Sequence, residues 1–134
     1  MIRISKLADY ACVLMVALMQ SHQALSAVDL AEKTAIQVPT VRKLLKLLSK
    51  KEWVSSSRGA LGGYQVAANI EAMSVLDLIE AVDGPIAVTD CASPLKQCGL
   101  TAHCGSKKHW LLINKTVRAS LQGLSLQDLA GENA

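Results

Sequence analysis

Apolar positions recur at helical spacing along most of the chain and form strand-like runs in only a few short stretches. In the first helical segment they fall on two faces, so that helix is expected to be buried on both sides. The expected helices span roughly residues 5–20, 26–33, 39–50, 74–83 and 107–122, with a last turn at 125–130. The pattern predicts a mostly α-helical protein.

Local start signals support these helices. Ser26, Ser74 and Ser125 each precede an aspartate by three residues, which is the spacing of a capping box. Pro39 suits the first position of its helix, where no backbone N–H is needed. Three of the predicted helices and the last turn therefore have a defined beginning.

The segment from residue 25 to residue 67 resembles a DNA-reading unit. Two short helices meet at a tight turn, and the second has an inner apolar stripe of Val41, Leu44, Leu45 and Leu48. Its outward positions carry Thr40, Arg42, Lys43, Lys46 and Lys50. A strand at 53–58, a turn at 59–63 and a strand at 64–67 follow, with Arg58 at the tip. This order predicts a winged helix-turn-helix domain over residues 1–84.

Charge sharpens this interpretation. The net charge is only +3, yet residues 40–58 hold six basic residues and one acid, a local charge of +5. Such asymmetry indicates an anionic partner for this segment, and Arg58 could reach a phosphate or the minor groove. Solvated helix faces also collect lysines, so charge alone does not identify DNA.

Three of the four cysteines lie in a loop over residues 85–106. Cys91, Cys98 and Cys104 are separated by six and five residues, beside Pro94 and Gly99, with no helical or alternating periodicity. A strand-like piece at 86–89 precedes them. Packing gives little reason to gather three thiols there, so the loop predicts a metal or cluster site. Zinc would accept the same thiolates with one further ligand.

The last region, residues 107–134, begins with a long helix. Its apolar stripe consists of Trp110, Ile113, Val117 and Leu121, continued by Leu124. A domain of this size has no obvious partner for that stripe. We expect a homodimer interface there, with packing back onto the same chain as the alternative.

Other function classes are disfavoured. The longest uncharged apolar run has nine residues, 11–19, too few to span a membrane. No cleavage site follows it, so a soluble, cytoplasmic protein is expected. In that reducing compartment thiols persist. An enzyme in which His103 or His109 activates Cys104 is a weaker alternative, because no oxyanion-hole or substrate motif accompanies the pair.

The chain resembles the bacterial winged-helix regulators that include IscR and NsrR, in which an iron-sulfur cluster controls DNA binding. The matching features are ISKLADYAC, LLSKKEWVSSSRG, RGALGGY, SVLDLIEAVDG and the three-cysteine loop, covering nearly the whole chain. Within the family it is most similar to regulators of SUF-type cluster assembly. The resemblance implies a DNA-binding transcriptional regulator, a repressor of cluster-assembly genes, that binds a pseudo-palindromic operator as a homodimer.

The resemblance also implies ligands. Cys91, Cys98 and Cys104 would hold the cluster, [2Fe-2S] in preference to [4Fe-4S], although the first spacing is one residue longer than in those relatives. IscR-like proteins supply a histidine where Lys107 stands. NsrR-like proteins supply an aspartate from the other subunit's first helix, and Asp9 matches it. Asp9 is therefore the expected fourth ligand, supplied in trans, with His103 and His109 as rivals. The alternative for Asp9 is an ordinary acid near the start of a helix.

Roles on DNA can be assigned by position. Thr40, Arg42 and Lys43 are expected near base edges or phosphates, Arg58 in the wing contact, and Lys6 and Lys46 on the backbone. Because IscR-like proteins carry an acid in place of Arg42, a different operator is expected. The sequence leaves open the operator, the cluster type, whether cluster-bound protein represses or activates, and whether iron-sulfur status, nitric oxide or redox stress is sensed. A regulator using zinc or reactive thiols is a further alternative.

Overall fold

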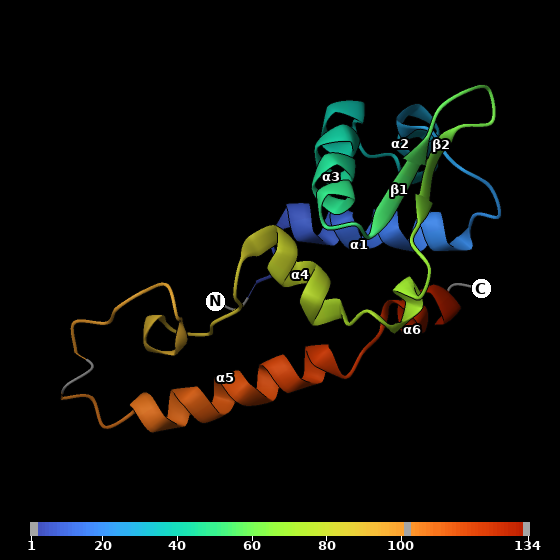
Figure 1. Ribbon diagram of the computed structural model, residues 1–134. Helices are drawn as coiled ribbons and strands as arrows, with labels where there is room; N and C mark the ends of the chain where they lie inside the picture. Colours follow the sequence, from blue (N-terminus) through green and yellow to red (C-terminus); the bar gives the residue numbers. More distant parts are fainter. Residues whose placement is uncertain (1–2, 101–102, 133–134) are drawn as a thin grey trace.

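The computed structural model describes residues 3–100 and 103–132 (Figure 1). In that part the chain forms six α-helices, two short 3-10 helices and one antiparallel hairpin. The elements are α1 Lys6–Gln20, α2 Ala27–Thr34, α3 Val38–Lys50, β1 Val54–Ser57, β2 Gly63–Val66, η1 Ile70–Ala72, α4 Val75–Asp83, η2 Asp90–Ala92, α5 Lys107–Gln122 and α6 Leu126–Glu132. The mostly helical, winged helix-turn-helix prediction is confirmed. No helix in the described part is both long and apolar enough to cross a membrane.

The predicted helix starts agree with the structure at every capping box. The Ser26 hydroxyl accepts from the Asp29 N–H at 3.0 Å, and the Asp29 carboxylate accepts from the Ser26 N–H at 3.0 Å. These bonds hold the pKa of Asp29 below its ordinary value. Pro39 is one position from its prediction: α3 begins at Val38, so Pro39 is the second helical residue. That position tolerates proline because its N–H also lacks an intrahelical acceptor.

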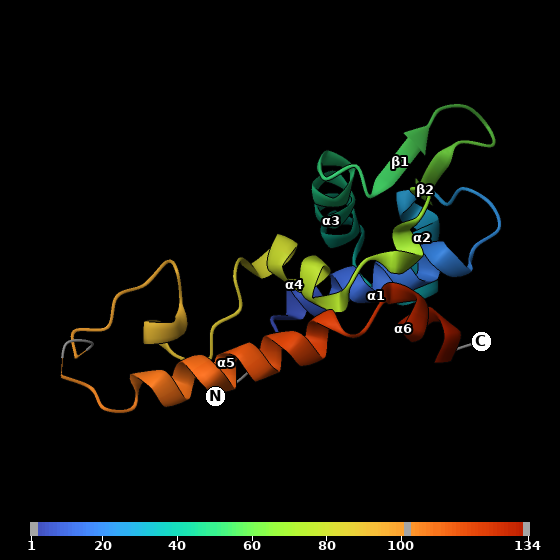
Figure 2. The same cartoon turned by 60° about the horizontal axis from the view of Figure 1, so that its bottom comes forward.

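Helix α1 is the centre of the fold. Its buried residues Leu14, Met15 and Leu18 contribute to a core shared with α2, α3, β1, α4 and α6. Figures 1 and 2 show α3 and the hairpin on one side of α1 and α5 on the other. The DNA-reading elements and the C-terminal helix therefore lie on opposite sides of a common support.

The hairpin is fixed to the helical core through Leu25. The Tyr64 N–H donates to the Leu25 carbonyl at 2.7 Å, and the Leu25 N–H donates back to Tyr64 at 3.1 Å. A Cβ at Gly63 would lie 2.7 Å from the Leu25 carbonyl carbon, and Gly63 has φ +143°. Only glycine permits this approach. The second glycine of the GGY motif thus joins the wing to the segment before α2.

One expectation for the C-terminal third is wrong. No strand forms at residues 86–89, because the Val88 N–H bonds to the Asn114 side chain of α5 instead of a neighbouring strand. At the end of the α5 stripe, the alternative of packing back onto the same chain holds for one residue. Leu121 packs in its own chain against the cluster of Ala8, Val75 and Ile79.

The junction of α4 and α6 gives a stability prediction. Ser74 is 7% exposed, its hydroxyl accepts from the Asp77 N–H at 3.0 Å, and the neighbouring backbone pairs with residues 124–126. Replacing Ser74 by alanine should lower the free energy of unfolding by about 0.5–2 kcal/mol, since the cap bond is lost. Urea unfolding measures this. Ser120→Ala, on the exposed side of α5, is the control and should be almost neutral; equal losses would contradict the capping role.

Candidate functional site

The outer face of α3 is the first part of the candidate site. Arg42, Lys43 and Lys46 are exposed and Thr40 is half-buried. The opposite face, Val41, Leu44, Leu45 and Leu48, is fully buried. The buried stripe fixes the rotation of the helix, so the basic side chains necessarily point to solvent. Such a helix, preceded by a short helix and a three-residue turn, has the geometry that enters a major groove.

The wing extends this surface. Its four paired positions run from Val54 opposite Val66 to Ser57 opposite Gly63. Arg58 follows the last pair directly and is exposed at the start of the tip. Figure 1 shows the hairpin beside α3 on the same side of α1. Lys6 is exposed at the first turn of α1, outside α3 and the wing.

The cysteine loop projects from one end of the molecule, away from α3 (Figures 1 and 2). Cys91 lies in η2 and is half-buried, as is Cys98, whereas Cys104 is exposed. The Cys91 Sγ is 3.1 Å from the Thr89 Oγ1. Among residues 3–100 and 103–132, no three His, Cys, Asp or Glu side chains are grouped closely enough to hold a metal ion. The three cysteines share one loop, but in this structure their thiols do not form a group that could hold a metal ion.

Two α5 residues hold the beginning of this loop, and the sequence analysis missed both. Asn114, only 8% exposed, accepts the Val88 N–H at 2.9 Å. Arg118 donates to the Ile86 carbonyl at 3.4 Å and pairs with Glu80 of α4. In the sequence, the sign of this role was an asparagine between Ile113 and Val117, two residues of an apolar stripe. The segment leading to Cys91 is therefore bonded to α5, and Arg118 also connects it to α4.

None of the proposed fourth ligands joins the loop cysteines within one chain. Asp9 is exposed on α1, and His103 and His109 are exposed on either side of the α5 start. In the described chain these three do not form a metal-binding group with the cysteines. A ligand for the loop would have to come from loop closure or from another molecule.

Cys12 differs from the loop cysteines. It lies one turn after Asp9, half-buried against the main core. Burial, and to a smaller extent the Asp9 charge, raises the pKa of the Cys12 thiol to about 11. The thiolate is the metal-binding form, and Cys12 is harder to deprotonate than an ordinary cysteine. Its position against the core indicates a packing residue.

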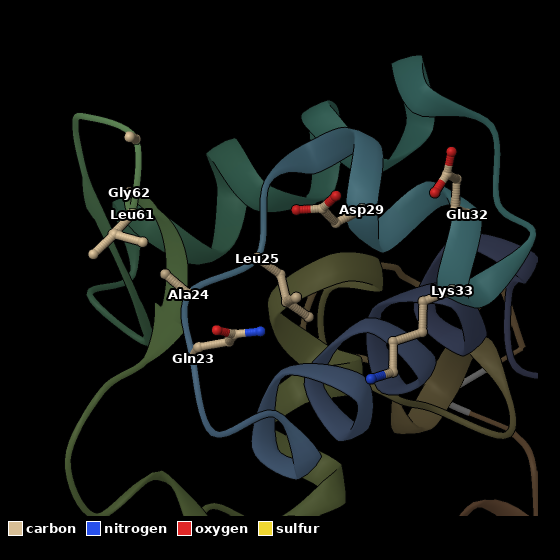
Figure 3. A pocket seen from close by; sticks show the side chains of 9 residues that line it. Gln23, Ala24, Leu25, Asp29, Glu32, Lys33, Leu61 and Gly62 are labelled. Carbon is tan, nitrogen blue, oxygen red and sulfur yellow. The ribbon is translucent and has the colours of Figure 1, made fainter.

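A hollow of about 720 Å³ lies between the wing and α2, and Figure 3 shows its lining. Leu25 forms part of its floor, Asp29, Glu32 and Lys33 belong to α2, and Leu61 and Gly62 to the wing tip. Both signs of charge are present and the hollow is open. It separates the wing tip from the acids of α2.

These features define a winged-helix DNA-binding protein. The Rrf2 family model, described as an iron-dependent transcriptional regulator, matches residues 4–132. The chain belongs to this family of transcriptional regulators, which are not enzymes, and the resemblance to the IscR and NsrR group is confirmed.

Individual relatives agree. The Rrf2 protein of Nitratidesulfovibrio vulgaris is 31% identical over 114 residues, 85% of this chain and 76% of that protein. The transcriptional regulator IscR of Aliivibrio salmonicida is 28% identical over 105 residues, 78% of this chain and 62% of that protein. Among solved structures, CymR, the global cysteine regulator of B. subtilis, has a TM-score of 0.78 at 25% identity and covers 98% of both chains.

Proposed function

We propose that this chain is a homodimeric repressor whose operator affinity is controlled by a bound iron-sulfur cluster, and that it governs cluster-assembly genes of the SUF type. The observation that carries the proposal is the attachment of the cysteine loop. Its first segment is bonded to Asn114 and Arg118 of α5, and Arg118 also pairs with Glu80 of α4. A change in the loop would therefore be transmitted to α5 and α4.

Cys91, Cys98 and Cys104 would hold the cluster, and the donor set suits it because soft thiolates bind the irons of such clusters. The exposed position of the loop leaves it accessible to cluster delivery. Bound there, the cluster supplies a reversible one-electron centre that oxidants or iron shortage can change or remove. We favour the [2Fe-2S] form over [4Fe-4S]. Thr89, whose hydroxyl lies within hydrogen-bond distance of the Cys91 sulfur, would adjust the reduction potential of the cluster.

Dimerisation through α5 would give the repressor its two recognition helices. The first half of α5 exposes Trp110, Leu111, Leu112 and Ile113 at 40%, 45%, 66% and 41%. Trp110 and Ile113 are three positions apart and so lie on the same side of the helix, where a second copy could cover them. A second copy packed there would place two recognition helices on one face. Half-sites about 34 Å apart on a pseudo-palindromic operator would then be read together in the cytoplasm.

Asp9 of the partner subunit is proposed as the fourth ligand. If so, Asp9→Ala should lose more than half of the bound iron and change the visible spectrum, because a carboxylate oxygen is replaced by solvent or an exogenous ligand. Iron analysis and absorbance under nitrogen measure this. Glu32→Ala, which removes an exposed acid from α2, is the control. Unchanged iron and spectrum in Asp9→Ala would exclude Asp9 and direct attention to His103 and His109.

The similarity to CymR favours a second candidate, a regulator that uses its cysteines as redox thiols or that binds zinc. If the cluster is bound, the signal it senses could also be nitric oxide or redox stress. Anaerobic purification tests the choice. A brown protein with iron and acid-labile sulfide supports the cluster. A colourless protein with stoichiometric zinc, or with reactive thiols and no metal, supports the second candidate.

A further inference from the structure

The tip of the wing carries one large apolar side chain that nothing in its own chain covers. Leu61 is 93% exposed, more than Leu95 at 76% or Leu100 at 68%. It lies in the loop after Arg58, at the end of the hairpin farthest from the core (Figures 1 and 2). A leucine left in water stabilises nothing in the fold, because it buries no surface.

The loop that presents Leu61 is closed tightly. The Gly62 N–H donates to the Gly59 carbonyl at 3.0 Å. A Cβ at Gly62 would lie 2.4 Å from the Ser57 carbonyl oxygen, and Gly59 has φ +105°. These glycines hold the turn in a shape that other residues resist. Leu61 is thereby presented outward on a constrained turn.

The charges around the tip indicate its partner. From Val54 to Val66 the hairpin contains Arg58 and no acidic residue. Two acids that line the hollow, Asp29 and Glu32, lie on α2 across it from Leu61 (Figure 3). The exposed basic face of α3 lies on the same side of α1 as the wing. A polyanion lying on α3 would therefore meet a tip with one cation and one apolar group.

The wing is long enough to bring single side chains to a minor groove. Four residues per strand extend the loop roughly 13 Å from Val54, and a minor groove, about 6 Å wide, admits a single side chain from the tip. Proteins that enter this groove insert leucine and similar side chains between base pairs, which unstacks and bends the duplex. Pyrimidine-purine steps such as TA unstack most easily.

We propose that Leu61 is a wedge that enters the minor groove beside each half-site and selects a deformable base step there. The proposal rests on the proposed DNA-binding function and adds a specificity determinant to it. The positive charge of Arg58 attracts the tip to the groove. Leu61 discriminates between base steps by how easily they unstack, without a hydrogen bond to any base edge.

Selection from a random 40-base-pair duplex pool tests the wedge. Wild-type protein should enrich pyrimidine-purine steps flanking the half-sites, and Leu61→Ala should keep the half-sites but lose the flanking preference. With duplexes from the wild-type selection, Leu61→Ala should bind about 10-fold more weakly, and changing the flanking TA to AA should have little further effect in this variant. Leu61→Met should restore most of the preference.

A direct measurement of unstacking completes the test. With 2-aminopurine at the flanking step, wild-type protein should raise the fluorescence and Leu61→Ala should not. Unchanged flanking preference and fluorescence in Leu61→Ala would overturn the wedge while leaving DNA binding intact. Failure of wild-type protein to enrich any duplex would instead overturn the proposed function. A change of oligomeric state in Leu61→Ala would assign the side chain to a protein contact and also overturn the wedge.

Discussion

Cys104→Ala should reduce the iron and sulfide of the anaerobically purified protein to background and abolish its visible absorbance. Cys104 is exposed on the loop, so its replacement removes a thiolate without opening a cavity in the core. A cluster held by three thiolates and one other ligand is not retained when one thiolate is lost. Thermal unfolding of the apo protein should stay within about 0.5 kcal/mol of wild type, as is usual for surface substitutions.

Cys12→Ala is the matched control for that experiment. Cys12 packs against the core, and burial raises the pKa of its thiol to about 11, so it is harder to deprotonate than an ordinary cysteine. Its variant should keep full iron and sulfide while losing some stability. Full iron in Cys104→Ala would remove Cys104 from the ligand set. Loss of iron in Cys12→Ala without unfolding would contradict the assignment of Cys12 to packing.

The second large effect concerns the outer face of α3. Arg42→Ala should weaken binding to the preferred duplex by about 1–3 kcal/mol and relax the preference at one base position, because a guanidinium can hold two acceptors of a guanine. Lys46→Ala should weaken all duplexes alike and reduce the slope of log affinity against log salt by about one. Both side chains are exposed opposite the buried stripe of α3, so neither change should affect folding.

Binding curves at several salt concentrations, on the preferred duplex and on a scrambled one, separate these two roles. Lys33→Ala, an exposed lysine at the end of α2, is the control and should change neither quantity. Equal losses on both duplexes in Arg42→Ala would reassign Arg42 to phosphate contact. A change of base preference in Lys46→Ala would reverse the two assignments.

Features set by neighbouring residues could be predicted from the sequence. The capping boxes at Ser26, Ser74 and Ser125 join residues only three apart, and each forms in the structure. The stripe on α3 has a strict helical period, and all four of its residues are buried. Pro39 was one position off because the first turn of a helix leaves several N–H groups unpaired.

Features that depend on residues far apart in the sequence could not be predicted from the sequence. The segment 86–89 has strand-like composition, but the Val88 N–H bonds to Asn114, 26 residues later. Whether Leu121 faces its own chain or another depends on where α5 crosses α4, which periodicity does not specify. The positions of Asp9 and the three loop cysteines on separate elements were foreseen, but their assembly into one site stays a prediction.

The account depends most on the link between cluster and operator. One preparation, purified under nitrogen, should be divided, and the cluster removed from half with a chelator and an oxidant. The affinity of both halves for duplexes selected by each form is then measured. The account predicts a difference of about 5- to 150-fold between the two forms, the usual range of coupling between linked sites. Equal affinities on every selected duplex would contradict cluster control, even if both halves bind DNA tightly.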